Sequence, residues 1–79
     1  MPTTQMITPA LACDQALTIA QQDAILAYRE LSMFRIELTL ESDGWHIDYE
    51  LKDPRWKGGG PHYVIDAHSG AILSKLYEQ

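Results

Sequence analysis

The sequence predicts an α+β domain in which one long N-terminal helix packs on a four-stranded antiparallel sheet. Apolar residues recur every three or four positions in the N-terminal third, and apolar and polar residues alternate in the middle third. The last third contains a glycine loop, an apolar strand, a turn and a second apolar strand. With 79 residues, the chain is expected to form a single domain over residues 8–79, preceded by a flexible segment at residues 1–7.

The helix is predicted to begin at Thr8, which can cap it, with Pro9 in the first helical position. Asp14 offers a second, later cap. No glycine or proline interrupts residues 10–32. Within this range an apolar stripe runs at helical spacing through Ala16, Ile19, Ala20, Ala24, Ala27, Tyr28 and Leu31. Because its alanines are small, this stripe lets a sheet approach the helix axis closely.

Two strands follow, joined by a turn at Asp43-Gly44. Residues 34–41 and 45–52 each alternate apolar with polar side chains, which is typical of strands with one buried face. A two-residue turn predicts that the apolar residues pair as Leu40 with Ile47, Leu38 with Tyr49 and Ile36 with Leu51. All apolar side chains then share one face of the sheet. The same register places like charges opposite each other, Glu37 against Glu50 and Arg35 against Lys52.

A second hairpin is predicted from strands at residues 63–65 and 72–73. The turn between them begins at Asp66 and ends at Gly70, where glycine tolerates a positive φ angle. Because Val64 is adjacent to Ile65, the first of these strands is expected to be buried on both faces.

A long surface loop separates the two hairpins. Residues 53–61 contain two prolines and three glycines, which disrupt a strand. The glycines are expected to supply positive φ angles and close backbone approach. They are Gly58, Gly59 and Gly60.

Composition and charge limit the classes of function. The net charge of −5 repels a phosphate backbone, so nucleic acid is not an expected partner. The single cysteine, Cys13, excludes an internal disulfide framework and a cysteine-based zinc cluster. No apolar run reaches the roughly 18 residues of a membrane span, and residues 1–8 do not resemble a signal peptide. The chain as given is therefore expected in the cytoplasm, or in the periplasm or outside the cell if a signal sequence has been removed.

No residue pattern predicts catalysis, a cofactor or a metal. His46 and Asp48 lie on one strand face, with Glu41 opposite His46 in the predicted register, but a solvated polar face explains this pattern without a metal. The run 57–60 differs from a phosphate-binding loop, because its lysine precedes the glycines and a strand follows them. The serines lack a nucleophile-elbow pattern, and no histidine is placed beside Cys13. We therefore expect a protein that is not an enzyme and binds no cofactor, with a small metal-binding protein or enzyme as the minority alternative.

The candidate binding site is a cluster of basic residues around a tryptophan. Three of the six basic residues, Lys52, Arg55 and Lys57, lie within six positions around Trp56. Trp and Arg often dominate protein interfaces, and loops on a rigid scaffold often carry function. One interpretation is that this loop docks an acidic partner protein; the other is that Trp56 covers an open edge of the core. The strand from Ala71 to Tyr77 has a weakly protected edge, so a homodimer is a further alternative.

The order of these elements and the final hairpin resemble the PepSY family. That family combines an alanine-rich helix with strands that end in an Asp-Ala-x-Thr/Ser-Gly turn and an apolar strand. The matching positions are Ala16, Ile19 and Ala20 in the helix, Trp45 and Tyr49 in the sheet, and Val64 to Leu73. The resemblance covers roughly residues 8–77 and implies a cystatin-like arrangement of helix and sheet. It also implies a bacterial, non-catalytic and typically exported module that inhibits or regulates a partner such as a peptidase.

The same C-terminal pattern is similar to small immunity proteins of the nuclear-transport-factor-two-like fold. The shared features are the tryptophan, the glycine loop and the pattern Ile-Asp-x-x-Ser/Thr-Gly-x-Ile-Leu, present here at residues 65–73. This resemblance implies an intracellular, acidic protein that neutralises a toxin by binding it. Both resemblances imply protein binding, and they differ in the partner, a peptidase or a toxin.

Overall fold

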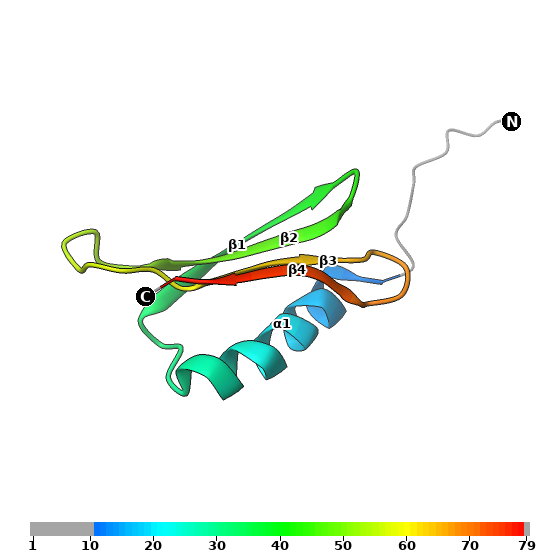
Figure 1. Cartoon of the computed structure of the whole chain (residues 1–79). Helices are drawn as coiled ribbons and strands as arrows, with labels where there is room; N and C mark the ends of the chain where they lie inside the picture. The colour runs from blue at the N-terminus through cyan, green and yellow to red at the C-terminus, as the bar shows by residue number, and fades with distance from the viewer. Residues whose placement is uncertain (1–10, 79) are drawn as a thin grey trace, which may run out of the picture.

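In the described part of the chain, four strands form one antiparallel sheet in chain order, and one helix packs on one face of that sheet (Figure 1). The computed structural model describes residues 11–78. The elements are α1 (Cys13–Tyr28), β1 (Phe34–Glu41), β2 (Gly44–Leu51), β3 (Pro61–Ile65) and β4 (Ile72–Tyr77). The α+β class, with one N-terminal helix on a four-stranded antiparallel sheet, is confirmed. The predicted flexible segment 1–7 and the predicted cap at Thr8-Pro9 lie outside the described residues.

Helix α1 begins at Cys13, later than the sequence predicts. Its start is displaced because Leu11 is held between β2 and the turn that follows β3. The Leu11 amide donates to the Ala67 carbonyl at 2.7 Å, and the Leu11 carbonyl accepts from the Trp45 indole at 2.9 Å. Asp14 lies in the first turn, where its negative charge suits the positive end of the helix dipole.

The helix ends at Tyr28, three residues before Leu31, the last member of the predicted stripe. Arg29 has a positive φ of 67° and a ψ of −44°, a backbone conformation with which an α-helix cannot continue. Its amide still donates to the Ile25 carbonyl at 3.0 Å. Leu31 therefore packs on the core from the connection to β1 rather than from the helix.

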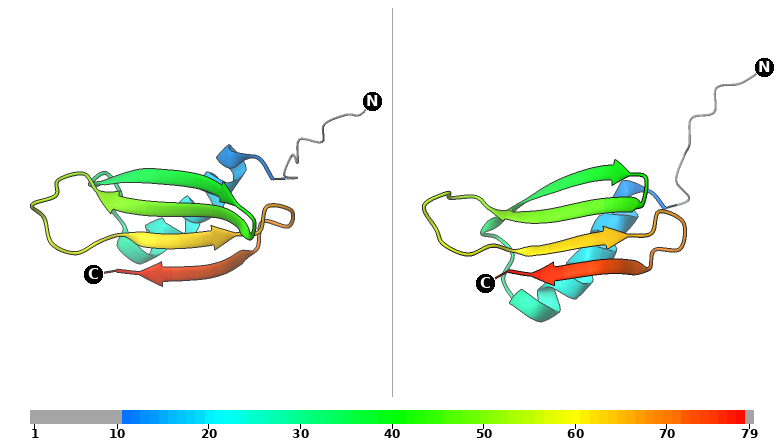
Figure 2. Two further views of the ribbon diagram at one scale, coloured as in Figure 1. Left: turned by 90° about the horizontal axis from the view of Figure 1, so that it is seen from above. Right: turned by 45° about the horizontal axis from the view of Figure 1, so that its top comes forward.

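Three alanines spaced four residues apart form the buried row of the helix. Ala16, Ala20 and Ala24 are fully buried, whereas Ala27 lies off this row and is exposed. The helix contacts β2 and β3 and lies obliquely across their strands (Figure 2). Opposite the alanines are the buried sheet residues Phe34, Ile47, Tyr49, Tyr63 and Ile65. Small helix side chains and large sheet side chains thus fill one thin core.

The first hairpin turns one residue earlier than predicted. Its turn residues are Ser42 and Asp43, and Gly44 begins β2 opposite Glu41. Every predicted pair is therefore wrong by two residues. Because this displacement is even, the apolar side chains still share one face. The observed pairs are Leu40 with Trp45, Leu38 with Ile47, Ile36 with Tyr49 and Phe34 with Leu51.

Gly44 explains why the turn moves. It has a φ of 138°, and a Cβ at this position would overlap the Ile65 carbonyl oxygen of β3. The glycine is thus required at the start of β2, where β3 approaches, rather than inside the turn. The shift also replaces the predicted charge pairs, which become Arg35 with Glu50 and Glu37 with Asp48.

The second hairpin closes through the turn at 66–70. The Asp66 carboxylate accepts from the amides of His68 at 2.7 Å and Ser69 at 3.0 Å. Gly70 ends the turn with a φ of 79°. Val64 is only partly buried, because α1 covers one face of the sheet, so the expectation that β3 is buried on both faces is wrong.

Candidate functional site

The candidate site is the connection between β2 and β3, which we call the tryptophan loop (Lys52–Gly60). It extends beyond the end of the sheet, away from the two hairpin turns (Figure 1). At its start, the Lys52 amide donates to the Met33 carbonyl at 2.9 Å. At its end, Gly60 is buried, and a Cβ there would lie 2.7 Å from the Tyr49 carbonyl oxygen. The loop therefore leaves the sheet from two fixed points.

The other two loop glycines lie between these points. Gly58 has a φ of 100°. Gly59 lies against the side chain of Glu78, which a Cβ would overlap. The glycines thus bring the returning chain close to both the sheet and the C-terminal end of β4.

Asp53 shapes the tip of the loop. Its Oδ1 accepts from the Arg55 amide at 3.0 Å and from Arg55 Nε at 2.9 Å, and its Oδ2 accepts from Nη2 at 2.7 Å. Its carbonyl accepts from the Trp56 amide at 3.1 Å. The Arg55 hydrogen bonds hold the pKa of the Asp53 carboxyl below its ordinary value. The free protein therefore already holds the backbone around Arg55 and Trp56 in a defined turn.

Trp56 lies on the surface of this turn. It is 51% exposed and belongs neither to the core nor to the side chains packed against it. Trp56 thus does not cover the edge of the core. Lys52, Arg55 and Lys57 are also exposed. With these three cations and one anion, Asp53, the loop carries a net charge of +2 in a chain of −5.

A second polar cluster lies on the face of the sheet that α1 leaves uncovered. His62 Nδ1 is 2.8 Å from Asp48 Oδ1, and His62 Nε2 is 3.3 Å from Glu78 Oε1. Burial opposes protonation of the imidazole, but the two carboxylates outweigh it and raise the pKa of His62 above 6.5. The sequence pattern carries no sign of this cluster, because three separate segments contribute to it.

The cluster predicts a stability that depends on pH. Because its pKa is raised, His62 stabilises the fold fully below pH 6.5, and this contribution is lost as pH rises through the folded-state pKa. We expect His62→Gln to lower the Tm more at about pH 5.5 than at about pH 8.5, followed by circular dichroism. Equal losses at both pH values would contradict this assignment.

The predicted grouping of His46, Asp48 and Glu41 does not form. Because the first hairpin is displaced by two residues, Glu41 lies opposite Gly44 rather than His46. His46 Nε2 instead lies 2.7 Å from Asp43 Oδ1. Among residues 11–78, no three His, Cys, Asp or Glu side chains are arranged to hold a metal ion.

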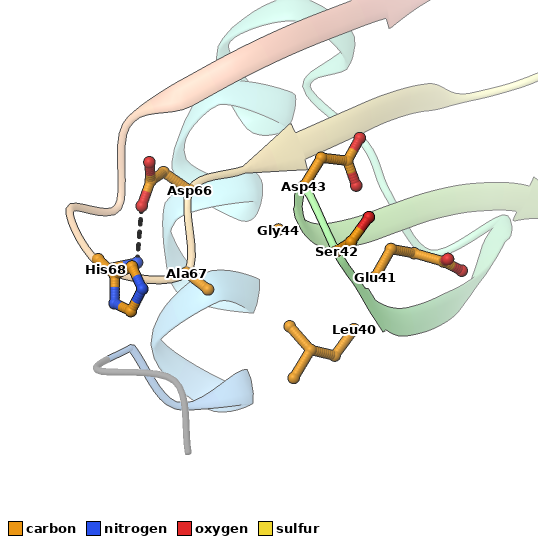
Figure 3. Close-up of a pocket in the computed structure, with 8 residues that line it drawn as sticks. All are labelled: Leu40, Glu41, Ser42, Asp43, Gly44, Asp66, Ala67 and His68. Atoms are coloured by element: carbon orange, nitrogen blue, oxygen red, sulfur yellow. Dashed lines mark hydrogen bonds between the residues drawn. The ribbon is translucent and has the colours of Figure 1, made fainter. Parts of the chain in front are cut away.

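A hollow of about 450 Å³ lies between the two hairpin turns (Figure 3). Acidic residues of both turns line it, among them Asp43 and Asp66. The hydrogen bond with His46 holds the pKa of Asp43 low, and turn amides, that of Ser69 foremost, do the same for Asp66. These two carboxylates therefore shape the turns beside the hollow.

Comparisons with known proteins do not assign a function to this site. In the part of the chain that the structure describes, no helix has both the length and the apolar character needed to cross a membrane. No family model matches the chain, and neither a curated protein nor a solved structure matches it. The PepSY and immunity-protein resemblances stay predictions.

Proposed function

We propose that this protein is a non-catalytic, PepSY-like module that binds a partner protein, such as a peptidase, and inhibits or regulates it through the tryptophan loop. The observation that most supports this proposal is the exposure of Trp56, 51%, on a turn that Asp53 holds in place. Burying a large aromatic side chain in a partner surface is favourable, because it removes apolar area from water.

The loop has further properties of a binding site. Because Asp53 orders the Arg55 side chain and the backbone of Trp56 before any partner arrives, less conformational entropy remains to be lost on binding. Trp and Arg are also the residue types most enriched among dominant interface contacts. The net charge of +2 on the loop favours an acidic surface on the partner.

The proposal predicts that Trp56 is needed for binding but not for folding. We expect Trp56→Ala to weaken the affinity for the partner about 30-fold or more, as loss of a dominant interface residue does. The free energy of unfolding should change by less than about 0.5 kcal/mol, because the side chain lies outside the core. The measurement combines a pull-down from the native organism, read by quantitative mass spectrometry, with calorimetric titration of the purified partner.

A matched control separates loss of a surface apolar group from loss of the site. Leu26→Ala removes a side chain that is 83% exposed on α1, outside the loop, and should keep full binding. Lys57→Glu should weaken binding through charge alone. A retained toxin would replace the peptidase as the partner, whereas equal retention by the wild type and Trp56→Ala would refute the loop as the binding site.

A further inference from the structure

Strand β4 leaves one edge of the sheet open. The strand order is β1-β2-β3-β4, so β4 pairs with β3 along one side, and none of the described strands pairs with its other side. All six residues from Ile72 to Tyr77 are exposed. An open edge of this kind presents backbone donors and acceptors that another strand can pair with.

Charged side chains protect β4 less than they protect β1 at the opposite edge. β1 carries Arg35, Glu37 and Glu41, whereas Lys75 is the only charged residue of β4. Lys75 Nζ lies 3.1 Å from Asp23 of α1, so its charge lies on the face of the sheet that α1 covers. Between residues 67 and 77 there is no acidic residue, although the chain as a whole carries a net charge of −5. Up to Tyr77, the edge is therefore a surface on which a second copy of this acidic chain is not repelled.

A bulge limits the part of β4 that can pair regularly. Val64 of β3 pairs with Ser74, and the next residue, Ile65, pairs with Ile72, which leaves Leu73 as an extra residue. Side chains before and after the bulge no longer alternate in one series. Regular alternation on the open edge therefore begins at Ser74 and continues to the C-terminal end of the strand.

We infer that two copies of this chain associate by pairing their β4 strands antiparallel, with Leu76 opposite Leu76 on the two-fold axis. An antiparallel pair related by a two-fold axis places residues on the same face opposite each other. This register pairs residues 75–77, the C-terminal end of β4, and stops before the bulge. A register centred on Lys75 would instead place two ammonium groups opposite each other.

The register brings complementary side chains together. Leu76, which is 59% exposed, contacts Leu76 of the other copy on the face of the sheet that α1 leaves uncovered. This contact removes apolar surface of both side chains from water, which favours association. Lys75 of each copy lies opposite Tyr77 of the other, an arrangement that allows a cation–π contact. Ser74 lies opposite Glu78, which follows β4 and whose carboxylate lies beside His62 of the same copy. The two sheets become continuous, and the two tryptophan loops lie toward opposite ends of the assembly.

The first test is the molecular mass in solution. We expect sedimentation equilibrium to give twice the chain mass of 8.9 kDa at high protein concentration, and Leu76→Lys to shift the equilibrium to the monomer. Ile36→Lys is the matched control, because Ile36 is 46% exposed on β1, at the other edge, and should leave the dimer intact. A wild type that remains monomeric, or a dimer that survives Leu76→Lys, would overturn the proposal.

The second test fixes the register by disulfide trapping in a Cys13→Ser background. Directly opposite residues of antiparallel strands have Cα atoms about 4.5–5.5 Å apart, which suits a disulfide. Leu76→Cys should therefore form a covalent dimer under mild oxidation. Ser74→Cys should not, because the two Ser74 positions are offset by four residues, about 13 Å along the strands. Cross-linking of Ser74→Cys that is as efficient as that of Leu76→Cys would exclude the proposed register.

Discussion

Gly44→Ala is expected to destabilise the domain by about 3 kcal/mol or more. Gly44 has a φ of 138°, which costs a residue with a Cβ on the order of 1–3 kcal/mol. The new Cβ would also overlap the carbonyl oxygen of Ile65, which is backbone at the end of the inner strand β3 and cannot rotate away. For a domain of this size, we expect the Tm to fall by roughly 12–24 °C. Thermal unfolding followed by circular dichroism measures this loss.

Gly70→Ala is the matched control for the backbone angle. Gly70 also has a positive φ, 79°, but a Cβ there would meet side-chain ends alone among its nearest atoms, Cδ1 of Ile19 at 3.0 Å and the methyl groups of Leu11 at 3.7 and 4.0 Å. The end of a flexible side chain can move aside, so we expect a loss nearer 1 kcal/mol. Similar losses for the two variants would show that the approach of β3 to Gly44 is not what makes this glycine necessary.

The contrast between these two glycines shows what local sequence can predict. The role of Gly70 follows from its neighbours, because an aspartate four residues earlier organises the same turn. Gly44 has a similar local pattern, Asp-Gly between two alternating segments, which favours a two-residue turn. Its real requirement comes from Ile65, 21 positions away. The period of two kept every apolar residue on the correct face, but it could not distinguish registers that differ by two residues.

The boundaries of the helix could not be predicted from its apolar spacing either. The apolar spacing from Ala16 to Tyr28 continues to Leu31, so periodicity alone does not show that Arg29 leaves the helix. At the other end, Leu11 lies outside the helix because it bonds to Ala67, in the turn after β3, and to Trp45 of β2. At the N-terminal end, long-range contacts thus override the local helical preference.

In the polar clusters too, features made by neighbouring residues could be predicted, whereas features made by distant residues could not. The basic residues and tryptophan of the loop are adjacent in the sequence, so their clustering at one place could be predicted directly. The bonds between Asp53 and Arg55 could also have been anticipated, because an aspartate two residues before an exposed arginine commonly forms a local turn. The His62 cluster could not, since Asp48, His62 and Glu78 meet only through the pairing of three strands.

The least predictable feature is a carboxylate on the sheet side of the helix. Asp23 of α1 accepts hydrogen bonds from the hydroxyl of Tyr63, at 2.8 Å, and from that of Tyr77, and Lys75 Nζ lies 3.1 Å away. Its side chain is only 19% exposed. The apolar pattern of the helix gives no role to Asp23, because the residues that bond to it come from β3 and β4. Asp23 thus fastens the open edge strand to the helix.

Asp23→Ala is therefore expected to cost about 1–3 kcal/mol, since the Tyr63 hydroxyl loses its acceptor while its side chain remains buried. Tyr77→Phe, which removes one donor from a more exposed residue and keeps the carboxylate, should cost less.

The hydrogen bond from Tyr77, with those from Tyr63 and Lys75, lowers the pKa of Asp23 below 3.8. Its contribution is then complete above that pH and lost as pH falls through the folded-state pKa. Urea unfolding of wild type and both variants at neutral pH measures these losses in the free energy of unfolding. The same measurement on wild type and Asp23→Ala at about pH 3 tests the role of the carboxylate. If the difference in free energy between these two proteins does not narrow in acid, the loss comes from packing rather than from the carboxylate.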